Sequence, residues 1–187
     1  QQKYIIYRSK KISAIFYPVL FTDGEIKNFQ QNYFYNEWLN IEIDNELINF
    51  ILPLENLDDI KIIERMKNNI EKLEIKELVN KYDIENYVFT LASYNNQKLN
   101  IYIKTEFESN QISKNFSYVI KDIENKKKLN FIIKDLKIKI NDLWKEKNLV
   151  NLLMPLSIKI NFKYGNFINL DNLKDVLNKI SIIDNYT

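Results

Sequence analysis

Leu47–Asn69, with the sequence LINFILPLENLDDIKIIERMKNN, is the stretch that decides the fold class predicted here. Its apolar run ends at Pro53-Leu54, and a short polar turn then leads into apolar side chains at helical spacing. We therefore predict a buried strand over Leu47–Leu54 that passes directly into a helix. Asn56 is the expected N-cap, and the acidic residues after it favour the positive end of that helix. A strand followed at once by a helix is the unit of layered α/β domains.

The segments around this unit predict the rest of a sheet. Residues of one strand alternate between the two faces of a sheet, so period-two apolar patterns and continuous apolar runs both indicate strands. The additional predicted strands are Ile12–Phe21, with Pro18 at an edge or bulge, Tyr87–Ser93, Leu99–Phe107 and Phe116–Ile120. The last three form an antiparallel meander, and short helices near Asn32 and Ile75–Tyr82 are expected before it.

Lys126–Lys147 is the longest predicted helix. Its apolar stripe has spacings of three and four and consists of Leu129, Ile132, Ile133, Leu136, Ile140, Leu143 and Trp144. Packing against the sheet explains this stripe, and a cofactor or lipid groove is the alternative. The predicted fold class is α/β (α+β), with a mixed central sheet of about five strands, a strand–helix–helix crossover and this helix on the sheet.

Two domains are expected, a main α/β domain over residues 1–150 and a second domain over residues 151–187. Pro155–Phe162 alternates like a strand, and an amphipathic helix with Leu173, Val176 and Leu177 follows it. The tail therefore predicts the beginning of a truncated β-α-β domain. Gln1-Gln2 at the start, without a methionine, predicts a processed or trimmed product that has lost any export signal.

Charge and composition limit the function classes. The chain has 187 residues, 27 basic and 25 acidic side chains, and a net charge of +2. A nucleic-acid partner is not expected, because phosphate binding needs a basic face and the only tight basic run is Lys126-Lys127-Lys128. No apolar run approaches the length of a membrane span. The oligomeric state is not predicted.

Histidine and cysteine are both absent from the sequence. Their absence removes disulfides, thiolate nucleophiles, Cys/His zinc sites and the usual base of a catalytic triad. The two glycines, Gly24 and Gly165, are too far apart for a phosphate-binding loop. We therefore expect no cofactor, no metal and no catalytic residue, and a protein that is not an enzyme.

Acidic residues offer the alternative to that expectation. Glu55, Asp58 and Asp59 form the densest acidic cluster after a predicted strand. They are explained as acids at a helix N-terminus. A carboxylate-based enzyme or a small-ligand-binding domain would instead need these acids to converge with one from the meander.

Aromatic residues offer the best binding candidate. Phe29, Tyr33, Phe34, Tyr35 and Trp38 lie close together on or near a predicted short helix. A lid over the core is the favoured interpretation of this cluster. A partner-binding patch made by Tyr33, Phe34 and Trp38 is the alternative, since Trp and Tyr are enriched at interface hot spots.

Several short motifs together resemble a known family. They are Tyr7-Arg8-Ser9-Lys10 before Tyr17-Pro18-Val19-Leu20, then Leu52-Pro53-Leu54 with Leu57 and Asp59, then Lys81-Tyr82 before Tyr87–Leu91, and finally Asp142-Leu143-Trp144-Lys145. Their order is similar to that of the secreted proteobacterial family known as domain of unknown function two thousand and sixty-six, in its alphaproteobacterial branch. The chain departs from that pattern at Asn32-Tyr33-Phe34 and at Asp83-Ile84.

The resemblance implies export to the periplasm and a fold somewhat like the amino-terminal domain of TolB. Likeness of fold carries little functional information, and the resemblance supplies no active site. The resulting hypothesis is a non-catalytic exported envelope module that binds another envelope protein or assembly.

Overall fold

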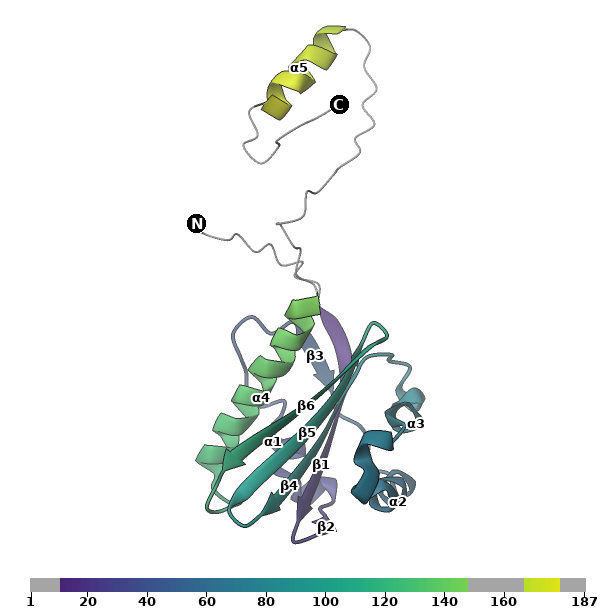
Figure 1. Ribbon diagram of the computed structural model, residues 1–187, viewed down its shortest axis with the longest axis vertical. Helices are drawn as coiled ribbons and strands as arrows, with labels where there is room; N and C mark the ends of the chain where they lie inside the picture. Colours follow the sequence, from purple (N-terminus) through teal and green to yellow (C-terminus); the bar gives the residue numbers. More distant parts are fainter. Residues whose placement is uncertain (1–10, 148–166, 179–187) are drawn as a thin grey trace. The chain divides into compact units, whose positions relative to one another are not determined.

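The structure is a computed structural model that describes residues 11–147 and 167–178. The chain divides into two compact units, residues 1–150 and 151–187. All of the strands described below belong to the first unit (Figure 1).

A mixed sheet of six strands forms the centre of the first unit. Its strands are β1 (Ile12–Thr22), β2 (Glu25–Ile26), β3 (Ile48–Ile51), β4 (Tyr87–Asn95), β5 (Lys98–Phe107) and β6 (Asn110–Val119). β1 pairs in parallel with β3 and β4, while β4, β5 and β6 form an antiparallel meander. The α/β class with a mixed sheet is thus confirmed, and the two-residue β2 brings the described sheet to six strands.

Pro18 lies inside β1 without disrupting the sheet. The first residues of β1 pair with β3 and its last two with β2, so one edge of β1 is open between them. The backbone carbonyl of Pro18 faces this gap, where the Asn32 side-chain amide donates a hydrogen bond to it at 3.1 Å. A proline has no N–H to lose at such a local edge.

Helices cover both faces of the sheet (Figure 1). One face carries α1 (Tyr33–Glu37) and α4 (Lys126–Lys147), and we call it the α4 face. The other carries α2 (Leu57–Met66), the short helix η2 (Lys67–Lys72), α3 (Ile75–Val79), and the single turns η1 (Phe29–Gln31) and η3 (Asn80–Tyr82); we call it the α2 face. No helix in residues 11–147 or 167–178 is long and apolar enough to cross a membrane.

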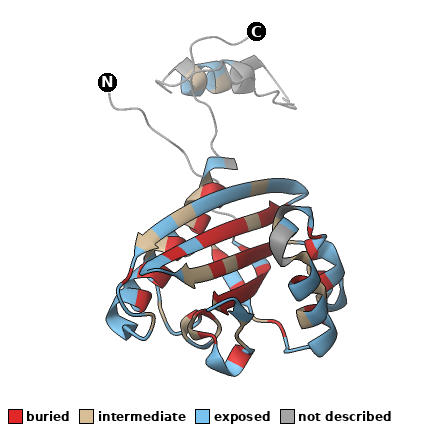
Figure 2. Cartoon of the chain, turned by 60° about the horizontal axis from the view of Figure 1, so that its bottom comes forward, coloured by how far each residue is buried: buried red, intermediate tan, exposed pale blue. Residues whose placement is uncertain are grey.

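The alternation of side chains along the strands decides which core each residue joins. Phe16 and Leu20 of β1 point to the α4 face, and Tyr17 and Val19 point to the α2 face. All seven residues of the predicted stripe on α4 are buried in the α4 face. Figure 2 shows the resulting pattern of buried central strands beneath more exposed surroundings.

Two local predictions differ from the structure. The strand predicted over Leu47–Leu54 is only β3, and Leu54 is exposed. The period-two pattern of Leu99–Phe107 predicts one buried row of side chains, but in β5 Tyr102 and Glu106 of the other row are buried as well, because the α2 face is covered where these two residues lie. The predicted pairing of three meander strands and the strand–helix–helix crossover from β3 to β4 are present.

The second unit contains the described helix α5 (Phe167–Asn178). The strands predicted at Pro155–Phe162 and after Ile180 lie outside the described residues. The β-α-β organisation of residues 151–187 therefore stays a prediction.

Candidate functional site

The aromatic residues of the predicted patch are mostly part of the core. Trp38 is fully buried against Phe16, with ring centroids 3.6 Å apart, and Phe34 is buried beside it. Asn32 begins this helix as expected, because its side chain accepts the backbone N–H of Phe34 at 3.0 Å. Only Tyr33 reaches the surface, where its hydroxyl donates to Asn130 at 2.8 Å. Phe34 and Trp38 therefore form a lid over the core, and of the three patch residues only Tyr33 remains accessible to a partner.

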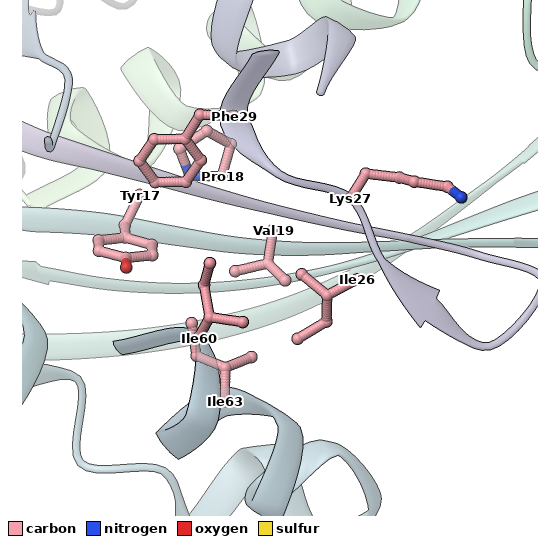
Figure 3. A pocket seen from close by; sticks show the side chains of 8 residues that line it. All are labelled: Tyr17, Pro18, Val19, Ile26, Lys27, Phe29, Ile60 and Ile63. Carbon is pink, nitrogen blue, oxygen red and sulfur yellow. The ribbon is translucent and has the colours of Figure 1, made fainter. Parts of the chain in front are cut away.

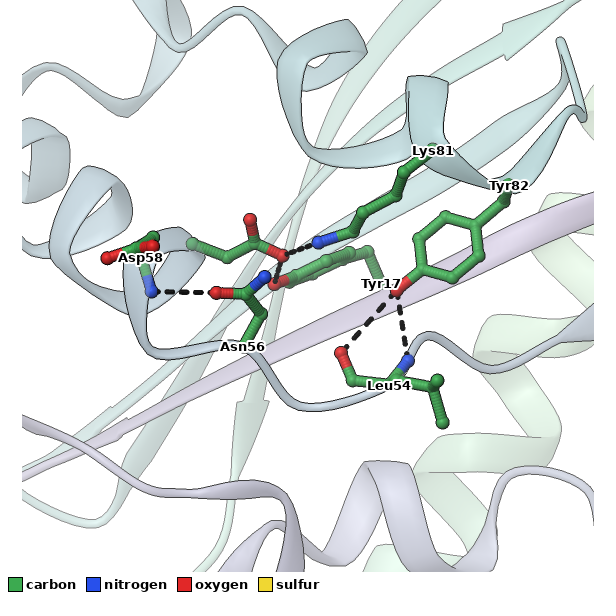
Figure 4. Close-up of polar contacts among 7 residues, drawn as sticks. Tyr17, Leu54, Asn56, Asp58, Lys81 and Tyr82 are labelled. Carbon is green, nitrogen blue, oxygen red and sulfur yellow. Dashed lines mark hydrogen bonds and ion pairs between the residues drawn. The ribbon is translucent and has the colours of Figure 1, made fainter.

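The acids after β3 do not converge on one space. Asp59 is buried beneath α2, where its carboxylate accepts a hydrogen bond from the Tyr17 hydroxyl at 3.1 Å and pairs with Lys81 (Figure 4). Asp58 points to solvent and pairs with Lys61 at 3.1 Å. No group of three acids in the described residues is placed to hold a metal ion.

Tyr17 and Asp59 form a fixed polar contact rather than a pair that exchanges protons. Burial raises the pKa of Tyr17, and the neighbouring Asp59 carboxylate raises it further. The Tyr17 hydroxyl therefore keeps its proton and donates a hydrogen bond to the Asp59 carboxylate. Because the Lys81 ammonium also binds this carboxylate, the cluster joins β1, α2 and η3 at one buried point.

The loop between β3 and α2 is held by polar contacts from three other elements. The hydroxyl of Tyr35 donates to the carbonyl of Pro53 at 2.9 Å. The hydroxyl of Tyr82 accepts the backbone N–H of Leu54 at 3.0 Å (Figure 4). The Glu55 carboxylate accepts the backbone N–H of Phe29 at 2.7 Å. The loop is therefore fixed in one conformation by α1, η3 and η1.

Two leucines at the end of this fixed loop, Leu54 within it and Leu57 at the first position of α2, are displayed to solvent. Leu54 is 76% exposed and Leu57 is 72% exposed, and together we call them the leucine surface. Asn56 lies between them and caps α2, since its side chain accepts the backbone N–H of Asp58 at 2.8 Å. Moving large apolar side chains out of water lowers the free energy of the system. Leu54 on the fixed loop and Leu57 beside it therefore suit a binding surface.

A small apolar hollow lies on the α2 face beside Tyr17. Figure 3 shows Tyr17, Val19, Phe29, Ile60 and Ile63 gathered around it. Its volume is about 10 Å³, close to that of a single water-sized sphere, and its walls are apolar. It is a packing gap and has no room for a substrate.

A larger open cleft of about 560 Å³ lies on the α4 face at the carboxyl end of β1. Buried apolar side chains form its floor, including Phe34, and Tyr33 stands at its rim. Lys27 and Lys126 contribute positive charge, but Asp23 and Glu124 contribute as much negative charge. Its lining residues are Leu20, Thr22, Asp23, Lys27, Gln31, Tyr33, Phe34, Ile123, Glu124, Lys126 and Leu129. The balanced charges favour no ionic ligand.

Sequence reasoning missed the leucine surface because it extended the strand through Leu54. Two leucines on either side of a helix N-cap look in sequence like residues that close the core. The tyrosines that fix the loop come from α1 and from the end of the crossover, and no local pattern links them to it. In the sequence, Tyr82 is only a position of the short helix predicted over Ile75–Tyr82 and part of the Lys81-Tyr82 motif.

Comparisons with known proteins give one structural likeness. No family model matches the chain, and no curated protein matches it. Among solved structures, the chain is similar to the lipoprotein GNA1162 from Neisseria meningitidis, with a TM-score of 0.36 and 9% sequence identity. The likeness covers 68% of this chain and 95% of that one.

Proposed function

We infer that the first unit is a non-catalytic protein-binding module of the cell envelope, periplasmic or secreted, and that its leucine surface contacts the partner. The single observation that carries the binding role is the exposure of Leu54, on a loop held by Tyr35, Tyr82 and Glu55, and of Leu57, where that loop enters α2. The location in the envelope rests on the motifs shared with the secreted proteobacterial family.

Rigidity is what distinguishes these leucines from ordinary exposed apolar residues. A flexible loop loses conformational entropy when a partner orders it, and that loss weakens binding. The hydrogen bonds on Pro53, Leu54 and Glu55 have already removed this freedom. The leucines can therefore enter a hollow of a partner at little additional cost, as central residues of interfaces do.

The charges beside the leucines indicate the character of the partner. Glu55, between the two leucines in the sequence, and Asp58, directly after Leu57, are exposed. An apolar hollow with basic residues at its rim would complement this arrangement, and the basic rim would mainly speed association.

Site-specific photo-crosslinking in envelope fractions tests the proposal. A photoreactive residue at position 57 should give a discrete crosslinked partner, and Leu54→Ser should abolish that product. Leu39, 52% exposed after α1, supplies the matched control, because Leu39→Ser removes an exposed leucine elsewhere. Equal crosslinking of the Leu54→Ser and Leu39→Ser proteins, or recovery of the protein only as a free monomer, would contradict the proposal.

A further inference from the structure

The two edges of the sheet differ in how much open backbone they present. One edge is made by β3 and β2, which have four and two residues and leave a gap at Pro18. The other edge is β6, with ten residues. Proteins commonly shorten, bulge or charge their edge strands, because an open edge pairs readily with other chains. The first edge has this protection.

The edge strand β6 has little protection of this kind against pairing with another chain. Its register with β5 is unbroken from Asn110 to Val119, so no bulge interrupts it, and it contains no proline. Lys114 is its single charged residue. In the described part of the chain, no strand pairs with its outer side. Figure 2 shows this outermost strand as mostly exposed, in agreement with its burial pattern.

The direction of its backbone groups follows from the register. The N–H of Ile120 donates to the carbonyl of Gln97, so this pair is hydrogen-bonded across the β5–β6 ladder. Hydrogen-bonded and non-bonded pairs alternate along antiparallel strands. Ser113, Asn115 and Ser117 therefore direct both their N–H and C=O groups away from β5. Their side chains are short and exposed, and leave these groups accessible.

We propose that β6 binds an extended segment of another protein by β-strand addition, and that this segment has an acidic residue between two apolar ones at alternate positions. On the α4 face, Ile112 and Phe116 are half-buried on either side of Lys114. An added strand places alternate side chains over these three positions. Apolar residues opposite Ile112 and Phe116, with a carboxylate opposite Lys114, complement them.

Charge selects a foreign segment over a second copy of this chain. Lys114 of β6 and Lys98 of β5 form no ion pair within the described residues. Two copies of β6 paired about their centre would bring two Lys114 side chains to the same face, where like charges oppose pairing. This proposal uses a different surface from Leu54 and Leu57 and does not rest on the proposed function.

A synthetic peptide with the central sequence Val-Thr-Glu-Thr-Val is the probe, and amide hydrogen exchange is the measurement. On binding, the amides of Ser113, Asn115 and Ser117 should gain protection, because strand addition pairs those N–H groups. Failure of the peptide to bind, or protection elsewhere without these three amides, would overturn the proposal. Protection of the same amides without peptide, rising with protein concentration, would assign the edge to a second copy and would also overturn it.

Asn115→Pro removes an outward N–H while leaving the ladder to β5 intact. We expect this change to weaken peptide binding at least about tenfold, since it deletes one intermolecular hydrogen bond and crowds the incoming strand. Asn115→Ala is the matched control, because it keeps the N–H and should bind the peptide like the natural chain. Equal affinity of the Asn115→Pro and Asn115→Ala proteins would contradict strand addition.

Lys114→Glu tests the acidic preference without touching the backbone. The reversed charge should weaken binding of the glutamate peptide by roughly threefold and favour a peptide with lysine at that position. Because position 114 is exposed, this variant should fold even where Asn115→Pro does not. An unchanged preference between the two peptides would refute the proposal that an acidic residue of the bound segment lies opposite Lys114.

Discussion

The two faces of the sheet bury charges of opposite sign, carboxylates on the α2 face and an ammonium on the α4 face. On the α2 face the buried carboxylates are Asp59, paired with the partly exposed Lys81, and Glu106, paired with the exposed Lys76. On the α4 face the buried charge is the Lys137 ammonium, which pairs with the partly exposed Glu46 at 2.9 Å and donates to the Ile41 carbonyl at 2.7 Å. Asp59 ties α2 to β1 and η3, whereas Lys137 fixes the irregular segment that contains Ile41 and Glu46 to α4.

The difference lies in what surrounds each charge. Lys137 lies on a helix of 22 residues whose apolar stripe already packs on the sheet, and its ammonium lies over the rings of Trp38 and Phe50. Asp59 lies on a helix of ten residues with few buried apolar side chains. Short helices gain less from packing, so polar contacts should matter more on the α2 face.

Removing a fully buried tryptophan ring of the α4 face should give the largest effect. Trp38→Ala should lower the free energy of unfolding by about 3–5 kcal/mol, because the lost ring leaves a cavity against Phe16 and Phe50. Urea unfolding followed by circular dichroism measures it. Trp38→Phe is the control and should cost much less, since it keeps an aromatic ring and removes an indole N–H that has no partner in the described residues. Similar losses for both variants would contradict a packing role.

The elements of the α4 face could be predicted from sequence because periodicity alone specifies them. The stripe on α4 has spacings of three and four along the whole helix, and its predicted bounds, Lys126–Lys147, are those observed. The alternation from Leu99 to Phe107 likewise gives one buried row. Such patterns are local, and a single segment contains all the information needed to find them.

The candidate site could not be predicted because its contacts are long-range. Asp59 meets Tyr17, which lies 42 residues away, and Leu54 meets Tyr82, which lies 28 residues away. In the sequence, Asp59 is indistinguishable from Asp58, and both suit the first turn of a helix. Only the orientation of α2 on the sheet decides that Asp59 faces the core and Asp58 faces water. The exposure of Leu54 follows from the early end of β3, which no apolar pattern marks.

Removing the buried carboxylate tests the importance of polar contacts on the α2 face. Asp59→Ala should lower the free energy of unfolding by about 2 kcal/mol, because the Tyr17 hydroxyl loses its acceptor inside the core. The partly exposed Lys81 can turn to water, so the loss stays below that of a fully buried pair. Unfolding in urea gives the value. Asp58→Ala, at the exposed neighbouring acid, should be nearly neutral, and equal losses would place the contribution in helix-dipole effects instead.

The matching change on the α4 face should cost less. Lys137→Met keeps an apolar stem and removes the ammonium, which contacts Ile41 and Glu46 and lies over the rings of Trp38 and Phe50, so we expect a loss of about 1 kcal/mol. The same unfolding experiment measures it. A loss larger than that of Asp59→Ala would reverse the comparison, because polar contacts would then matter more on the face with the longer helix.

Acid should weaken the fold through two carboxylates whose pKa values are lowered. Burial alone would raise the pKa of Glu106, but hydrogen bonds from Gln111 and Lys76 outweigh it, and contacts from Lys139 and Tyr118 do the same for Asp135. A carboxylate whose pKa is lowered by folding stabilises the protein fully at a pH above its pKa in the unfolded chain, which is near 4. This stability is lost as the pH falls through the lower pKa of the folded chain.

The measurement is the free energy of unfolding between pH 7 and pH 2. It should stay level to about pH 5 and then decline, and Glu106→Gln should make the decline shallower. Asp58→Asn, at an exposed acid, serves as the control and should leave the slope unchanged. A slope identical in the Glu106→Gln protein would mean that the acid transition comes from other groups.

The smallest effect on stability is expected at the leucine surface, where the effect on binding should be large. Leu54→Ser with Leu57→Ser removes side chains that are already in water, so the free energy of unfolding should change by less than about 0.5 kcal/mol. Tyr82→Phe tests the contribution of the fixed loop to binding apart from that of the leucine side chains. It leaves both leucines in place and removes the hydroxyl that holds Leu54. It should weaken partner crosslinking while leaving circular dichroism unchanged. If Tyr82→Phe retained full crosslinking while the double variant lost it, apolar contact alone would carry the binding and the fixed loop would be dispensable.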